Sequence, residues 1–365
     1  MSLQIMANNS IASNTKKMEL TRQSNFELLR ILSMAGVLLN HTIRTLWNIF
    51  EPELSWPNGC RIFLMSWAIL AVNCFIMISG YFTIKLSWKG VVKYYAQCFF
   101  YMALFVGISA IINHSLTITD LSKVAFACSE SHWFIYCYFA LMLASPLLNK
   151  ALLGMGMKQM RWAIVLLLFV DVYLGYIHQV PEVASVGFEL THLAIMYLLG
   201  NYISRTPVRR APWGWLLLGI VLLMTLLHIL KWYYPVAGVL YSQHYSSPCL
   251  IAGSLIMFLW ARTWTLQSKV VNWCAGGVFA VYLIHFNEYF QPYFWSWLRA
   301  IRDMGTFYTI PVLLTVADTL FFCLFILIDK LRFRIFHPLE GKIADQLSAT
   351  TSSIRQRINL GSDDQ

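Results

Sequence analysis

The sequence consists of long apolar runs separated by short polar stretches, and this pattern limits the fold more than any other feature. Runs such as 162–174 and 213–230 show no period-two alternation, so they indicate helices and not barrel strands. A bilayer leaves no water for backbone groups, and only helices and closed barrels can span it. Charged residues make up 12% of the chain and its mean hydropathy is +0.59, whereas soluble domains carry about 25% charged residues. We therefore expect an all-α, polytopic transmembrane helical bundle.

About ten spans are expected, joined by loops too short to separate two domains. A polar N-terminal segment (1–23) precedes the membrane domain (24–340), and a polar tail (341–365) follows it. The end of this tail is expected to be disordered. The first 24 residues lack a short apolar core before a small-residue cleavage site, so no cleavable signal peptide is expected. The predicted spans are 25–47, 61–82, 91–113, 131–149, 161–179, 190–204, 213–231, 247–264, 273–298 and 308–330.

Basic residues are distributed unevenly between the two predicted sides of the membrane. Of the 27 Lys and Arg residues, 20 fall on one side and 6 on the other, with Arg30 inside the first span. The positive-inside rule then places both termini in the cytoplasm. The same short basic loops account for the net charge of +10, and no continuous basic patch favours nucleic acid as a partner. The 8 cysteines show no CxxC spacing. We therefore expect them to be small apolar residues of the core and not metal ligands.

An arginine and a histidine lie eleven residues apart in the first apolar run. Eleven residues at about 100° each bring Arg30 and His41 onto one helix face, separated by about 16 Å along the axis. An ionisable group within a span is costly and marks a functional site by default. Glu27 lies one turn before Arg30 and is placed to pair with it. The alternative is that Arg30 extends to the interface and His41 only ends the helix near the outer surface.

Two further groups of residues have the composition of a site. His285 and Glu288 are three positions apart in the ninth predicted span, where a carboxylate can orient an imidazole. The alternative is a buried polar pair that fixes helix packing. Lysines at every fourth position follow the second span and would share a face if helical; they fit either a phosphorylated ligand or anionic lipid headgroups. These lysines are Lys85, Lys89 and Lys93.

Isolated polar residues also occur within or beside the apolar runs. Each of them more often serves packing than catalysis, but together they indicate a hydrated interior. They include His132, Asp171, His192 and Asp318.

The ordered set of motifs resembles the acyltransferase-3 family of integral membrane acyltransferases, which includes bacterial O-acetyltransferases of surface glycans. The resemblance covers about residues 24–340. Two departures stand out: Asn73 replaces a proline found in many members, and the basic loop after the second span contains only lysine. Lysine lacks the bidentate fork of arginine, so detailed CoA contacts do not transfer. The matching motifs are Arg30 with His41, Ser79-Gly80-Tyr81, Trp133-Phe134, Ser145-Pro146 and Tyr282-Leu283-Ile284-His285.

The resemblance implies a multi-pass protein of the bacterial cytoplasmic membrane that moves an acyl group, expected to be acetyl, from acyl-CoA to a hydroxyl group. The expected acceptor is a cell-envelope glycan or a lipid-linked sugar, and envelope-assembly proteins are potential partners. Acyl-CoA would be a co-substrate, with no tightly bound cofactor. His41 would be the general base, with Arg30, His285 and Glu288 in the catalytic set. The CoA phosphates would meet Arg30, Lys85, Lys89 and Lys93.

Two alternatives come from other functional classes. A transporter or flippase for a lipid-linked or anionic substrate would also use a polar interior and a basic cytoplasmic face. No paired broken helices of the inverted-repeat type are evident in the sequence. A structural subunit of an envelope-assembly complex would tolerate apolar residues at Arg30 and His41.

Overall fold

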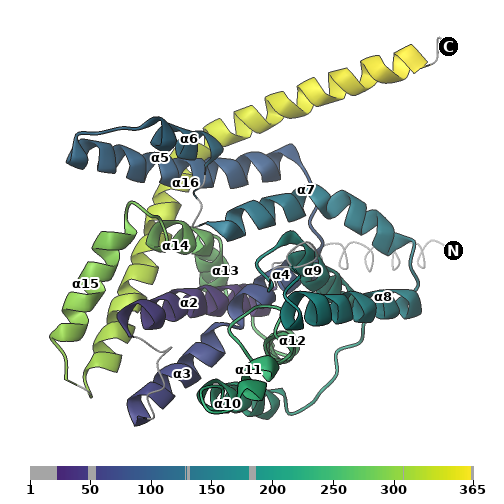
Figure 1. Ribbon diagram of the computed structural model, residues 1–365. Helices are drawn as coiled ribbons and strands as arrows, with labels where there is room; N and C mark the ends of the chain where they lie inside the picture. The colour runs from purple at the N-terminus through teal and green to yellow at the C-terminus, as the bar shows by residue number, and fades with distance from the viewer. Residues whose placement is uncertain are drawn as a thin grey trace, which may run out of the picture.

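The computed structural model describes residues 23–47, 55–127, 129, 132–180, 186–306 and 308–362, and these ranges contain helices and no strand. The predicted all-α bundle is thus confirmed (Figure 1). The predicted N-terminal segment lies outside these ranges except for Gln23. The helices are α2 (Ser24–Leu46), α3 (Trp56–Ala68), α4 (Ala71–Phe82), α5 (Trp88–Asn113), α6 (Ile118–Phe126), α7 (Trp133–Leu153), α8 (Met157–Val170), the π-helix η1 (Asp171–Ile177), α9 (Leu190–Ser204), α10 (Trp213–Leu230), α11 (Pro235–Leu240), α12 (Pro248–Arg262), α13 (Lys269–Ala275), α14 (Val278–His285), α15 (Gln291–Asp303) and α16 (Ile310–Ser362).

Seven helical stretches in the described ranges are long and apolar enough to cross a membrane. The shorter apolar helices α12 and α13–α14 lie among them, as does the 15-residue α9. The number of ten spans and the cytoplasmic termini stay predictions. The seven stretches are Ser24–Leu46, Trp56–Phe82, Trp88–Asn113, Trp133–Leu153, Met157–Ile177, Trp213–Leu230 and Ile310–Ile354.

The ninth predicted span, 273–298, is wrong as a single helix. The chain breaks at Gly276-Gly277 between α13 and α14, and again after His285, before α15 begins at Gln291. Asn287 supports the second break, because its side-chain oxygen accepts a hydrogen bond from the Tyr289 backbone (3.1 Å). Such a local bond offers the backbone an alternative to the helix. The apolar composition of the run masked both breaks.

Helices α4 and α9 pack against each other through two glycines. A Cβ atom on Gly80 would lie 1.9 Å from the Tyr197 carbonyl oxygen, and one on Gly200 would lie 2.1 Å from that of Met77. Small residues allow membrane helices to approach closely enough for backbone contact. The contact fixes the end of α4 from which the lysine-bearing segment departs.

Helix α16 is continuous from Ile310 to Ser362, which corrects the expectation of disorder at the end of the tail as far as Ser362; residues 363–365 lie outside the described ranges. At 53 residues it is about 80 Å long, and its end extends beyond the bundle (Figure 1). Buried polar contacts at Asp329, Arg332 and Glu340 lie where it packs on α5. Arg332 bonds Asp329 (2.8 Å) and Glu340 (2.7 Å), and Asp329 also accepts from Gln97 (3.0 Å). The two ion pairs lie within α16 itself, and the bond from Gln97 ties this part of the helix to α5.

Candidate active site

A cavity of about 340 Å³ lies between α2, α4, α5, α7 and α14. Apart from tyrosines and a tryptophan, its polar lining side chains are Arg30, His41, Ser79, Lys93 and Gln97. Enclosed pockets with a few polar groups among aromatic rings are typical of sites for small ligands. Aromatic rings form much of the remaining wall, among them Tyr94, Trp133, Phe134, Tyr138, Tyr245 and Tyr282.

Arg30 and His41 both line this cavity from α2, so the shared face expected from their spacing is present. Their separation of about 16 Å along the helix axis puts them at different depths. Glu27 pairs with Arg30, with Nη1 2.9 Å from one carboxylate oxygen. Arg30 thus contributes a positive group held by its own helix at one depth of the cavity.

His41 forms a direct pair with His285, a residue 244 positions away in the chain. Nδ1 of His41 lies 2.8 Å from Nε2 of His285, and Nδ1 of His285 lies 2.5 Å from the carbonyl oxygen of Val281. A carbonyl only accepts, so Nδ1 of His285 carries a proton. In the neutral ring Nε2 of His285 is then an acceptor, and it accepts a hydrogen bond from the N–H at Nδ1 of His41. The remaining nitrogen of His41, Nε2, carries the lone pair.

Helix α14 and the segment after it position this pair. His285 is the last residue of α14, is fully buried and bonds back to the carbonyl four residues earlier. The next residue, Phe286, stacks on the His41 ring with centroids 4.4 Å apart. The break after α14 therefore supplies both the hydrogen-bond partner and the packing surface of His41.

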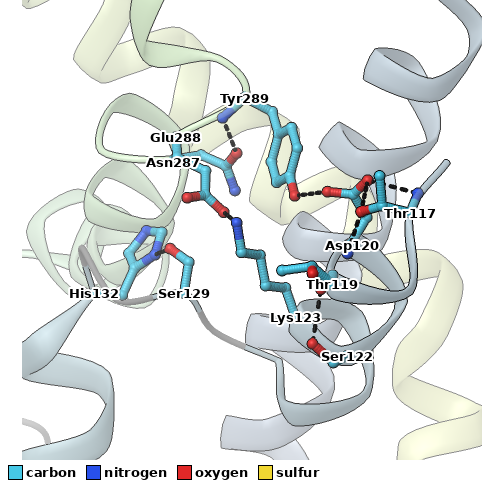
Figure 2. Close-up of polar contacts among 10 residues, drawn as sticks. All are labelled: Thr117, Thr119, Asp120, Ser122, Lys123, Ser129, His132, Asn287, Glu288 and Tyr289. Atoms are coloured by element: carbon cyan, nitrogen blue, oxygen red, sulfur yellow. Dashed lines mark hydrogen bonds and ion pairs between the residues drawn. The ribbon is translucent and has the colours of Figure 1, made fainter. Parts of the chain in front are cut away.

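Glu288 does not contact His285, contrary to the expectation of a shared helix face. Because α14 ends at His285, Glu288 leaves the helix and pairs with Lys123 of α6, 2.8 Å away (Figure 2). Beside it the Tyr289 hydroxyl donates a hydrogen bond to Asp120, also on α6. That bond, with others from Thr117, lowers the pKa of Asp120 to about 2. Glu288 thus ties the post-α14 segment to α6.

A third histidine, His132, lies next to the pair. It is the N-cap residue of α7, is 1% exposed and contacts Ser129, with Nδ1 and Oγ 2.8 Å apart (Figure 2). It packs edge-on against Tyr282 and Phe286, with centroids 5.6 and 6.1 Å apart. The sequence marks His132 as polar, but only the fold brings it near His41 and His285.

The three lysines do not share a helix face. Lys93 on α5 lines the cavity, whereas Lys89 is exposed on the first turn and Lys85 lies before the helix begins at Trp88. The segment carrying Lys85 is nevertheless held firmly. Asn149 donates to the Ile84 carbonyl (2.8 Å), and the Tyr197 hydroxyl accepts from the Ile84 backbone (3.0 Å). These anchors come from α7 and α9, and the local spacing gave no sign of them.

Comparison with known proteins identifies the family. Residues 23–328 match the acyltransferase-3 family model, which describes an acyltransferase domain. No curated protein and no solved structure matches the chain. The comparisons give no support to the transporter alternative. The matched region covers most of the chain, including the whole cavity and the His41–His285 pair. The chain therefore belongs to the acyltransferase-3 family, and its apolar helices make it a multi-pass membrane acyltransferase.

Proposed function

We propose that the protein transfers an acetyl group from acetyl-CoA to a hydroxyl group of a cell-envelope glycan or lipid-linked sugar, with His41 as the general base. The observation that carries this proposal is the His41–His285 hydrogen bond of 2.8 Å, whose partner bond to Val281 leaves the lone pair on Nε2 of His41. A neutral imidazole in a fixed tautomer is suited to accept a hydroxyl proton.

In the proposed step the acceptor oxygen forms a bond to the thioester carbonyl carbon, and the carbon–sulfur bond breaks. The hydroxyl proton passes to Nε2 of His41 and then to the departing CoA thiolate, so the enzyme returns to its starting state. A positioned base of this kind contributes about 10²- to 10⁴-fold in rate. His285 keeps the His41 proton on Nδ1 and is a positioning residue for the base.

The donor is proposed to lie along the cavity with its phosphates near Arg30 and Lys93 and its thioester toward His41. The separation of about 16 Å between Arg30 and His41 along α2 suits a donor whose charged and reactive ends are far apart. At this distance Arg30 does not reach the carbonyl oxygen. Lys85 and Lys89 would add positive potential at the entrance without direct contact.

Membranes containing the protein, incubated with acetyl-CoA labelled in the acetyl group, provide the test. Label should appear in a glycan or lipid fraction, and His41→Ala membranes with equal amounts of folded protein should give background. His337→Ala, which removes an exposed histidine on α16, is the matched control and should keep wild-type labelling. Label that enters every fraction equally with and without His41 would contradict the proposed base. A wild-type protein that neither binds nor consumes acetyl-CoA would contradict the proposed donor.

A further inference from the structure

A buried chain of hydrogen bonds links three helical elements outside the cavity. His192 of α9 contacts Asp171 of η1 through Nδ1 (2.8 Å) and Asn73 of α4 through Nε2 (3.0 Å). All three side chains are 0% exposed. Polar groups buried this deeply in a membrane protein are costly, so they indicate a specific role.

The donors and acceptors in this chain can be assigned. The side-chain nitrogen of Asn73 donates to the backbone carbonyl of Tyr245 (3.1 Å), so its oxygen faces His192. Nε2 of His192 must then carry a proton, and the other ring nitrogen faces a carboxylate oxygen. A second proton then lies between Nδ1 of His192 and Asp171. It belongs either to the ring, which gives an imidazolium–carboxylate pair, or to the acid, which gives a neutral ring and a protonated acid. Each form leaves the pair without net charge.

The series of hydrogen bonds from Asp171 through His192 and Asn73 ends at Tyr245, which lies at the cavity. The Tyr245 side chain lines the cavity, and its ring lies 5.6 Å from that of Trp133 and 4.9 Å from that of Phe188. Tyr245 belongs to the connection between α11 and α12, which is not helical. Asn73 therefore fixes a non-helical backbone at the point where it supplies a cavity wall.

We infer that Asn73 and His192 are positioning residues that hold Tyr245 as a wall of the acyl-transfer cavity, with Asp171 orienting His192. This inference rests on the proposed function. A fixed wall keeps water away from the thioester while the acceptor is bound. If the wall is loose, water replaces the acceptor hydroxyl: its oxygen bonds the carbonyl carbon, one of its protons passes through His41 to the departing CoA thiolate as the carbon–sulfur bond breaks, and acetic acid and CoA are released. The hydrogen bonds among Asp171, His192 and Asn73 would thus set the ratio of transfer to hydrolysis.

The test compares two variants that each remove a buried asparagine-to-carbonyl bond of the same length. Asn73→Leu releases the Tyr245 carbonyl, whereas Asn25→Leu breaks a 3.1 Å bond to Ala261 that joins α2 to α12 without lining the cavity. Two quantities are measured on the full-length protein in nanodiscs: hydrogen exchange of residues 241–247, and the ratio of labelled acetate to labelled acceptor formed from acetyl-CoA. Asn73→Leu should speed the exchange and raise the acetate ratio at least fivefold. Asn25→Leu should leave both at wild-type values even though it lowers thermal stability.

Two further variants keep the test decisive if Asn73→Leu does not fold. Asn73→Asp has the same shape and still accepts from His192, but as a carboxylate it does not donate to the Tyr245 carbonyl, so in that form it should behave as Asn73→Leu. Asp171→Asn can donate to a neutral His192 and should stay within about twofold of wild type. If Asn73→Leu and Asn25→Leu give the same hydrogen exchange and the same acetate ratio, these hydrogen bonds only support folding and the inference is wrong. A wild-type protein that forms neither acetate nor labelled acceptor instead contradicts the proposed function, and the exchange measurement still reports on Tyr245.

Discussion

Nδ1 of His41 lies 2.8 Å from Nε2 of His285, and this contact joins the first described helix to the end of α14. The bond from Nδ1 of His285 to the Val281 carbonyl fixes which ring is the donor in the pair. It leaves Nε2 of His285 to accept a hydrogen bond from Nδ1 of His41. The orientation of His41 is thus set by a backbone carbonyl and not by a carboxylate. This differs from the histidine–carboxylate arrangement of serine hydrolases, in which an acid orients the base.

Substitution of His285 should test this arrangement. His285→Gln retains a side-chain oxygen that can accept from His41, whereas His285→Leu removes the acceptor and leaves Nδ1–H of His41 buried without a partner. The leucine variant should lower kcat about 10²-fold, near the lower end of what a positioned base contributes, and the glutamine variant should lose less. Rates of CoA release with equal amounts of folded protein measure the difference. Equal losses in the two variants would show that the bond to His41 is not what His285 supplies.

Arg30 and Lys93 should act on binding of the donor. Arg30→Gln and Lys93→Gln each remove a positive group from the cavity wall, and a hydrogen bond to a charged group is worth about 1.5–3 kcal/mol. We expect KM for acetyl-CoA to rise about 10- to 100-fold with a smaller change in kcat. Lys158→Gln, an exposed position on α8, is the control and should leave KM unchanged. A fall in kcat at constant KM would assign Arg30 to the chemical step instead.

The glycine contact between α4 and α9 should be intolerant of any side chain. In Gly80→Ala the new methyl group would meet the Tyr197 carbonyl at 1.9 Å, so the helices must separate. Overpacking of this kind costs about 1–3 kcal/mol or more, and the thermal midpoint in detergent should fall. Gly219→Ala on α10 meets nothing within 4 Å and should be neutral. A Gly80→Ala protein as stable as Gly219→Ala would mean that α4 and α9 do not pack as described.

The bond between Asp120 and Tyr289 predicts a pH dependence of stability. Because this bond, together with the bonds from Thr117, lowers the pKa of Asp120 to about 2, the ionised form favours folding. The contribution is present above the unfolded value of about 3.9 and is lost as the pH falls through about 2. Asp120→Asn and Tyr289→Phe should narrow the gap in thermal midpoint between pH 5 and pH 2.5 relative to wild type. If the gap is the same in all three proteins, the bond does not stabilise the folded state.

Helical periodicity and local spacing predicted the parts of the site that belong to one helix. Arg30 and His41 share a face because both lie on the uninterrupted α2, and Glu27 pairs with Arg30 one turn away. The same reasoning failed for Glu288 and for the lysines, because it required helices that the chain does not form. Asn287 and the glycine pair interrupt the ninth predicted span, and α5 begins only after Lys85.

Contacts between distant segments could not be read from the sequence. The partner of His41 is 244 positions away, and the bonds of His192 reach 119 positions to Asn73. Such pairs depend on how helices cross, which composition and periodicity do not determine. The tail shows the same limit: its polar sequence predicts disorder, but contacts such as the 2.8 Å bond from Trp88 to Thr351 hold it along α5 as a helix.

If His41 is the base for acyl transfer from acetyl-CoA, the His41→Gln protein should transfer acetyl slowly, and its rate of transfer tests this role. Wild type, His41→Gln and His337→Gln are purified into nanodiscs, matched for folded protein, and supplied with labelled acetyl-CoA and the acceptor fraction that wild-type membranes label. We expect His41→Gln to be slower by about 10²-fold or more with KM for acetyl-CoA nearly unchanged, and His337→Gln to match wild type. Transfer by His41→Gln within a few fold of the wild-type rate would show that His41 is not the base.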